Sequence, residues 1–305
     1  MKDIKLKYLD SKNIFGTMNT GTINLRNITK DDKVMLMYKN DLKPTELIDI
    51  TRMSFDEKTK MILEYNLKPS ELKNYQLTKS DKNMIFANHR RAFAEANGFD
   101  WHKMFMAGQV NKDGSYFEIT RDYVEANPNG WTDIPEDILI ITDKTPGVAI
   151  GHPVADCPVI IMEDVKNNVT AIAQCSAELI DKRMPMMIAD ALNSAYDTKD
   201  EDIKVHVSPC AGPIWTYYDK WPGFANDKKI WKDTGAITEW HDNEFKINLR
   251  AAIEGQLIER GIGQNVSYDF ADTIIDREYY SNSESRSNPA KHGRQFNGAI
   301  YQKVR

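Results

Sequence analysis

The sequence predicts an α/β protein with a mixed sheet as its core. Its 305 residues, of which 41% are hydrophobic, are enough to bury a substantial interior. Short apolar runs of buried-strand length follow one another in the central part, and helical patterns follow these runs, as expected for strands and helices that pack in layers. The apolar runs cover residues 138–142, 147–151, 159–162 and 169–173.

The N-terminal third predicts two strands followed by a helical segment. Residues 14–17 and 21–25 are typical of short strands around an Asn/Gly turn. Residues 30–81 are rich in Lys, Asp and Glu with helical spacing, and a Lys-Pro-x-Glu-Leu pattern occurs twice, at 43–47 and 68–72. Proline is common where a helix begins, so local capping is the favoured interpretation and a pair of partner-binding helices is the alternative.

Helices are predicted over residues 82–97, 185–196 and 246–260. The last is the clearest, because Leu249, Ile253 and Leu257 recur every four residues on one face. Gly98 and Gly261 follow two of these helices and supply the left-handed residue with which helices often end. Residues 203–207 alternate like a strand, and 298–301 form the last predicted strand. We therefore expect one domain over residues 1–305, with residues 30–81 as a helical insertion within it.

Charge and hydropathy exclude several classes of function. The net charge is −5 and the lysines are dispersed, so no basic surface for nucleic acid is expected. No run approaches the roughly 18 apolar residues of a membrane span, and the N-terminus lacks a signal-peptide core. Cys157, Cys175 and Cys210 form neither an even set nor a Cys-x-x-Cys pair, which favours free thiols in a reducing compartment. We expect a cytoplasmic protein without membrane contact.

Residues 213–245 hold four of the six tryptophans in a segment rich in Gly, Asp and Lys. Tryptophans in such a segment most often anchor a long loop on the core. A stacking surface for a planar ligand is the alternative. The sequence leaves both interpretations open.

One constellation carries a resemblance to a known family. Ala155-Asp156-Cys157-Pro158 follows an apolar run and resembles the Ala-Asp-Cys-x-Pro signature of the YfiH-type family, also called the laccase-domain or multicopper polyphenol oxidoreductase family, without the intervening residue. Further segments are similar to elements of that family and come in its order. They are Gly108-Gln109-Val110-Asn111, residues 171–174 ending at Gln174, residues 207–213, 248–252 and 279–281, and His292-Gly293-Arg294.

The resemblance implies a laccase-domain α/β fold and a site where one Cys and two His hold zinc. It also implies activity on purine nucleosides, as a phosphorylase or an adenosine deaminase. In this chain Cys157 is retained, whereas Asn111 and Gln174 stand at the two histidine positions and Glu178 stands at an arginine position. Neutral amides are poor zinc ligands compared with imidazole. No cofactor is therefore expected.

The residue replacements favour a binding site over a catalytic one. Amides offer paired donors and acceptors that suit the edge of a base or a sugar hydroxyl. An arginine beside a glycine turn suits an anion, which makes Arg294 a candidate phosphate contact. The candidate ligand-binding residues are Gln109, Asn111, Asp156, Cys157, Gln174 and Arg294.

Three hypotheses follow for the function. The first is a non-catalytic or weakly catalytic protein that binds, and in one version sequesters, a purine-type nucleoside or nucleotide. The second is an active enzyme of the family's class with a rebuilt zinc site, in which Cys157, His152 or His89 supplies the missing ligand and Cys157 is the candidate catalytic residue. The third is a protein-interaction module. The sequence leaves the oligomeric state open, with a homodimer as one possibility.

Overall fold

The computed structural model describes residues 4–15, 91, 93–108, 111–128, 133–142, 147–213, 217–218, 221–241, 244–276, 278–284 and 294–303. The predicted insertion at 30–81, the strand at 21–25 and most of the helix at 82–97 lie outside these residues. Residues 93–97 of that helix are helical, and Gly98 has the expected positive φ of 75°.

Two sheets form the body of the protein. The first is five-stranded with the order β1-β14-β6-β2-β4, and the second is six-stranded with the order β13-β9-β7-β8-β5-β3. The strands of the first sheet are β1 (Ile4–Phe15), β2 (Met104–Ala107), β4 (Asp133–Ile134), β6 (Ala149–Val154) and β14 (Arg294–Lys303). Those of the second are β3 (Tyr116–Ile119), β5 (Ile138–Ile141), β7 (Val159–Asp164), β8 (Val169–Gln174), β9 (Ile203–Val207) and β13 (Val266–Tyr268).

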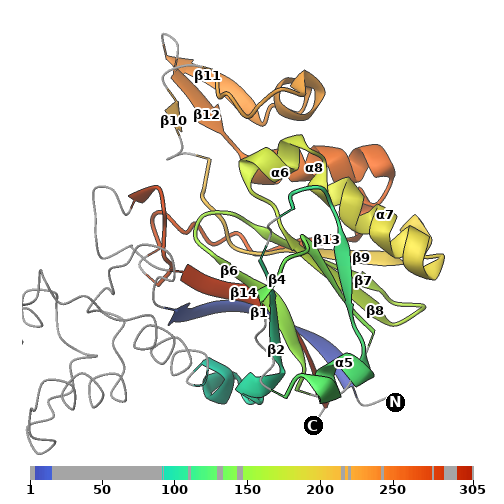
Figure 1. The fold of residues 1–305 in the computed structure, drawn as a ribbon. Coiled ribbons are helices and arrows are strands. Elements are labelled where there is room, and N and C mark those ends of the chain that lie inside the picture. The colour runs from blue at the N-terminus through green and yellow to red at the C-terminus, as the bar shows by residue number, and fades with distance from the viewer. Residues whose placement is uncertain are drawn as a thin grey trace, which may run out of the picture.

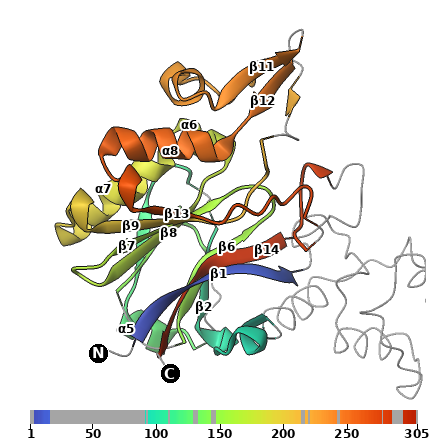
Figure 2. The same cartoon turned by 180° about the vertical axis from the view of Figure 1, so that it is seen from behind.

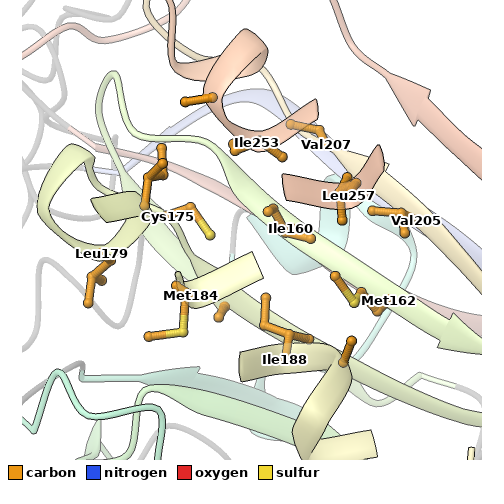
Figure 3. Packing of buried hydrophobic residues seen from close by; sticks show 14 of the residues in the cluster. Ile160, Met162, Cys175, Leu179, Met184, Ile188, Val205, Val207, Ile253 and Leu257 are labelled. Carbon is orange, nitrogen blue, oxygen red and sulfur yellow. The ribbon is translucent and has the colours of Figure 1, made fainter. Parts of the chain in front are cut away.

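The six-stranded sheet is buried on both faces, which explains the continuous apolar runs of its central strands. On β7, Val159 and Ile161 face the five-stranded sheet, whereas Ile160 and Met162 face the helices. Figure 3 shows the helix side of this core, where β7 and β9 meet residues of α7 and α8. The outer face of the five-stranded sheet packs against residues 93–94 and 99.

Three helices cover the six-stranded sheet (Figure 1), and the fourth labelled helix lies near the start of β2. They are α6 (Ala177–Asp181), α7 (Met184–Tyr196), α8 (Leu249–Arg260) and α5 (Arg121–Ala126). Short turns of other helix types are η4 (Trp101–Lys103), η5 (Asp200–Asp202), η6 (Lys229–Asp233) and η7 (Gly263–Asn265). None of the helices that the structure describes is long and apolar enough to cross a membrane.

A small sheet with the order β10-β12-β11 projects from the body above α6 and α8 (Figures 1 and 2). Its strands are β10 (Tyr217–Tyr218), β11 (Ile237–His241) and β12 (Glu244–Ile247). Trp231 is fully buried and its indole nitrogen donates to Asp181 at 2.8 Å, while Trp221 donates to the Ala225 carbonyl at 2.8 Å. These two tryptophans anchor the segment. The side chains of Trp215 and Trp240 lie outside the described residues.

The central strands and α7 are confirmed within two or three residues of the predicted bounds. Two predictions are wrong. Residues 246–247 belong to β12, because they pair with β11 before Asn248 caps α8. β1 extends over Ile4–Phe15 and pairs antiparallel with β14, whereas the sequence predicted a strand only from residue 14. β1 is stabilised by hydrogen bonds with β14, which is distant in the sequence, so the local residue pattern did not reveal this strand.

Candidate functional site

The chain crosses from one sheet to the other between β6 and β7, and the predicted site residues gather there. Val154 at the end of β6 pairs with Gln295 on β14, so Arg294 lies beside the crossing. Val159 at the start of β7 pairs with Gln174 at the end of β8. Asp156, Cys157, Gln174 and Arg294 therefore form one group, which we call the strand-end cluster.

Asp156 holds the crossing in place. Its φ of 77° is left-handed, a conformation that Asp tolerates better than most residues. One carboxylate oxygen accepts from the Thr273 hydroxyl at 2.8 Å and the other from the Ser283 amide at 2.7 Å, while its carbonyl accepts from the Ala211 amide at 2.9 Å. Asp156 thus ties three loops around Cys157, and its carboxylate is already used within the chain.

Cys157 is partly buried between a hydrogen-bonding amide and two charges. Burial raises the pKa of its thiol to about 11. The hydrogen bond with Gln174 and the positive charge of Arg294 oppose this effect, and the negative charge of Asp156 adds to it. At neutral pH the thiol therefore stays protonated and is a weak nucleophile.

The loop that carries Asn111 lies at the same end of the second sheet. Asp137 precedes β5 and accepts from the backbone amides of Lys112, Asp113 and Gly114 at 2.9, 2.6 and 2.9 Å. Because Ile138 pairs with Ala173, this anchor places the loop next to the end of β8. The Asn111 amide itself is exposed and donates to the Ser115 hydroxyl at 3.2 Å.

Glu178, which stands where the family resemblance implies an arginine, is paired with cations. Its carboxylate lies 2.8 Å from the Lys112 ammonium and 3.5 Å from that of Lys182. The pair with Lys112 connects α6 to the Asn111 loop, whereas Lys182 caps α6 itself. The structure thus brings the three replaced positions, Asn111, Gln174 and Glu178, to one end of the sheet.

Two further cysteines and an arginine that sequence analysis did not select lie near Cys157. The antiparallel pairing of β7 with β9 continues past the strand ends. The Ser208 amide donates to the Val159 carbonyl and the Ala211 amide donates to the Asp156 carbonyl, which places Cys210 opposite Cys157. Burial is the main cause that raises the pKa of Cys210 to about 12, and the positive charge of Arg250 opposes it. The Cys175 pKa is also raised by burial and by Cys157. Because these cysteines are brought together by the register of the strands, the sequence alone did not indicate that they lie close to one another.

His152 lies between the two sheets rather than at the surface of the cluster. It faces Asn297 across the β6–β14 ladder and is 1% exposed. Burial lowers the pKa of its imidazole to about 3, and neither ring nitrogen has a hydrogen-bond partner within the part of the chain that the structure describes. The ring is therefore neutral at physiological pH. Gln109, His89 and His292 lie outside the described residues.

The comparisons with known proteins agree with this arrangement. A family model described as multi-copper polyphenol oxidoreductase laccase matches residues 65–302. The chain belongs to this family. No match was found among curated proteins.

Solved structures support the fold of the family. The protein YfiH from Bacillus licheniformis is 18% identical, with a TM-score of 0.60 over 72% of this chain and 82% of that one. YlmD from Geobacillus stearothermophilus is 17% identical, with a TM-score of 0.61 over 72% and 81%. A Neisseria meningitidis protein is 13% identical, with a TM-score of 0.54 over 77% and 83%. At these identities the likeness establishes the laccase-domain fold alone.

The residues present do not fit the zinc that the family resemblance implies, nor copper, which also binds to imidazole and thiolate. Gln174 offers an amide in place of an imidazole, and the Asn111 amide bonds within its own loop. Within the described ranges, no three His, Cys, Asp or Glu side chains are arranged to hold a metal ion. The described side chains of the strand-end cluster offer hydrogen-bonding and charged groups to a ligand.

Proposed function

We propose that the strand-end cluster binds, and in one version sequesters, a purine-type nucleoside or nucleotide with little or no conversion of it. The observation that carries the proposal is that the amides of Asn111 and Gln174 stand where the family resemblance implies metal-binding imidazoles, within the fold of the family. Gln174 offers donors and an acceptor, which suit a base edge or a sugar hydroxyl.

Arg294 supports a nucleotide rather than a nucleoside as the ligand. Its guanidinium lies near Cys157 and Asp156 in a partly buried position, where burial lowers its pKa without removing its charge at neutral pH. Guanidinium groups bind phosphate in forked geometry, which suits the arginine to the phosphate of a nucleotide.

The proposal places the protein in the cytoplasm, which holds free nucleotides. The described cysteines, Cys157, Cys175 and Cys210, are free thiols and fit that compartment. No nucleic acid or membrane is required as a partner.

Calorimetric titration of the purified protein with adenosine monophosphate and adenosine tests the proposal. Protein treated with a chelator should bind the nucleotide as tightly as untreated protein, and chromatography of the mixture should show no product. Gln174→Leu, which keeps the size but removes the amide, should weaken binding, and Arg294→Gln should weaken the nucleotide more than the nucleoside.

Three outcomes would contradict the proposal. Conversion of adenosine or inosine by metal-stripped protein would show a metal-independent enzyme. Stoichiometric zinc in purified protein, lost together with activity in Cys157→Ala, would instead favour a rebuilt zinc enzyme. If neither purine binds and deletion of residues 30–80 abolishes capture of a partner protein, the interaction hypothesis replaces both.

A further inference from the structure

Phe270 is a large apolar residue exposed on the loop that runs from β13 toward the candidate site. Its side chain is 74% exposed, the highest value among the large hydrophobic side chains that the structure describes as exposed. It follows β13, the edge strand of the six-stranded sheet. Exposing a phenyl ring to water is unfavourable, so a partner that covers the ring lowers the free energy.

The ring is supported from one side. The Arg250 guanidinium carbon lies 5.7 Å from the centroid of the Phe270 ring, and the Tyr268 ring lies 5.7 Å away at an angle of 32°. Arg250 is held in place because it donates to the Ala271 carbonyl at 2.7 Å. A cation behind an aromatic ring is a stabilising arrangement. The large exposed fraction leaves the other side of the ring open to a ligand.

The loop that carries the ring is fixed by hydrogen bonds. Asp269 donates its amide to the Val207 carbonyl at 2.9 Å and accepts from the Ala271 amide through its carboxylate at 2.9 Å. Asp272 accepts from the Gly212 and Ile274 amides, each at 2.9 Å. Phe270 therefore lies between two residues whose carboxylates hold the loop in place. The loop is already ordered, so fixing it costs little conformational entropy when a ligand binds.

The same loop leads directly into the strand-end cluster. Asp272 forms a bridge with Cys210, and the Thr273 hydroxyl donates to Asp156 beside Cys157. Thr273 lies three positions after Phe270, which is at most about 10 Å of chain. Arg250 lies close enough to Cys210 for its charge to act on that thiol. The ring and the cluster thus lie within reach of one elongated ligand.

We propose that Phe270, backed by Arg250, is the platform on which the planar base of a purine nucleotide stacks while the strand-end cluster holds the rest of the ligand. This inference rests on the proposed function and adds the residue that recognises the base. Stacking on an aromatic ring is tolerant of base identity, so the platform selects for a planar base rather than for one particular purine.

Titration with two probes, adenosine monophosphate and ribose 5-phosphate, tests the platform. Phe270→Ala should weaken adenosine monophosphate about tenfold, within the range found when base stacking on an aromatic is removed. It should leave the affinity for ribose 5-phosphate unchanged, because that probe has no base. Phe270→Trp should retain or strengthen nucleotide binding. Ile275→Ala is the matched control, since Ile275 is also exposed in this loop at 57% and should not change either affinity.

The outcomes separate this inference from the proposed function. If the unmodified protein binds adenosine monophosphate and Phe270→Ala binds it equally well, the platform is wrong and the proposed function stands. An equal loss for both probes also contradicts the platform, since the base would not be the group affected. If the unmodified protein binds neither probe, both proposals fail. If Phe270→Ala converts a dimer into a monomer without changing nucleotide affinity, the ring is a contact between copies of the chain.

Discussion

The burial of His152 predicts a specific loss of stability in mild acid. In the unfolded chain its imidazole has an ordinary pKa of 6.5, whereas in the fold burial lowers the pKa to about 3. Between these values the unfolded state binds a proton that the folded state does not. Stability is therefore complete above pH 6.5 and is lost as the pH falls from 6.5 toward 3.

The magnitude follows from the two pKa values. Each pKa unit corresponds to about 1.4 kcal/mol, so His152 alone should cost about 2 kcal/mol of unfolding free energy between pH 7 and pH 5. His152→Gln removes the titrating group and keeps a polar side chain of similar size. Urea unfolding of both proteins at pH 7 and pH 5 gives the four free energies required.

The difference between the two proteins isolates the histidine, since the other titrating groups are shared. The unmodified protein should lose about 2 kcal/mol more than His152→Gln between the two pH values. Equal losses would refute the reasoning. If the variant does not fold, nuclear magnetic resonance of labelled histidines provides a second measurement. A His152 resonance that shifts between pH 7 and pH 5 would show that the ring is protonated in the folded state.

Three further predictions concern other buried or charged groups. Burial alone would raise the pKa of Asp164, but hydrogen bonds from Asn167, Thr198 and Lys166 outweigh it and hold the pKa below its ordinary value. Asp164→Asn should therefore lower the free energy of unfolding in urea by about 2 kcal/mol at pH 7. It should also make the free energy of unfolding less dependent on pH below about pH 4. The same pH dependence in both proteins would contradict this. The Cys157 thiol should react with iodoacetamide about a hundredfold more slowly at pH 7 than a free cysteine, because its pKa is raised. The reaction rate should still rise with pH above about pH 9. Fast labelling at pH 7 would show that the pKa of the thiol is lower. Arg260 donates to Asp200 at 3.0 Å and to the Met186 carbonyl at 3.1 Å. Arg260→Met should therefore lower the unfolding free energy by about 1–2 kcal/mol. The control Arg91→Met removes a more exposed ion pair and should change the unfolding free energy little.

Much of the fold could be predicted because its core strands are buried on both faces. Burial between the second sheet and the helices makes β5, β7 and β8 continuous apolar runs, which stand out in the sequence. α8 stood out for a related reason, since one apolar face is repeated every turn and Gly261 ends it with a φ of 88°. β1 was missed beyond its last residues because it depends on pairing with β14 at the opposite end of the chain.

The candidate site was predicted in composition and not in arrangement. The order of the family-like segments identified Asp156, Cys157, Gln174 and Arg294 from residue identity alone, and their role in ligand binding stays a prediction. The sequence also showed that imidazoles are missing where the family resemblance implies them. These conclusions depend only on which side chains are present.

Only the tertiary structure decided which groups lie together and in what state. Cys210 and the loop after β13 come close to Cys157 because ladder bonds and the Asp156 contacts bring distant loops to one end of the two sheets. The neutral His152 ring and the protonated Cys157 thiol follow from burial, which depends on packing by every layer of the fold. Side-chain chemistry is local and can be read along the chain, whereas proximity and dielectric environment arise only when the chain has folded.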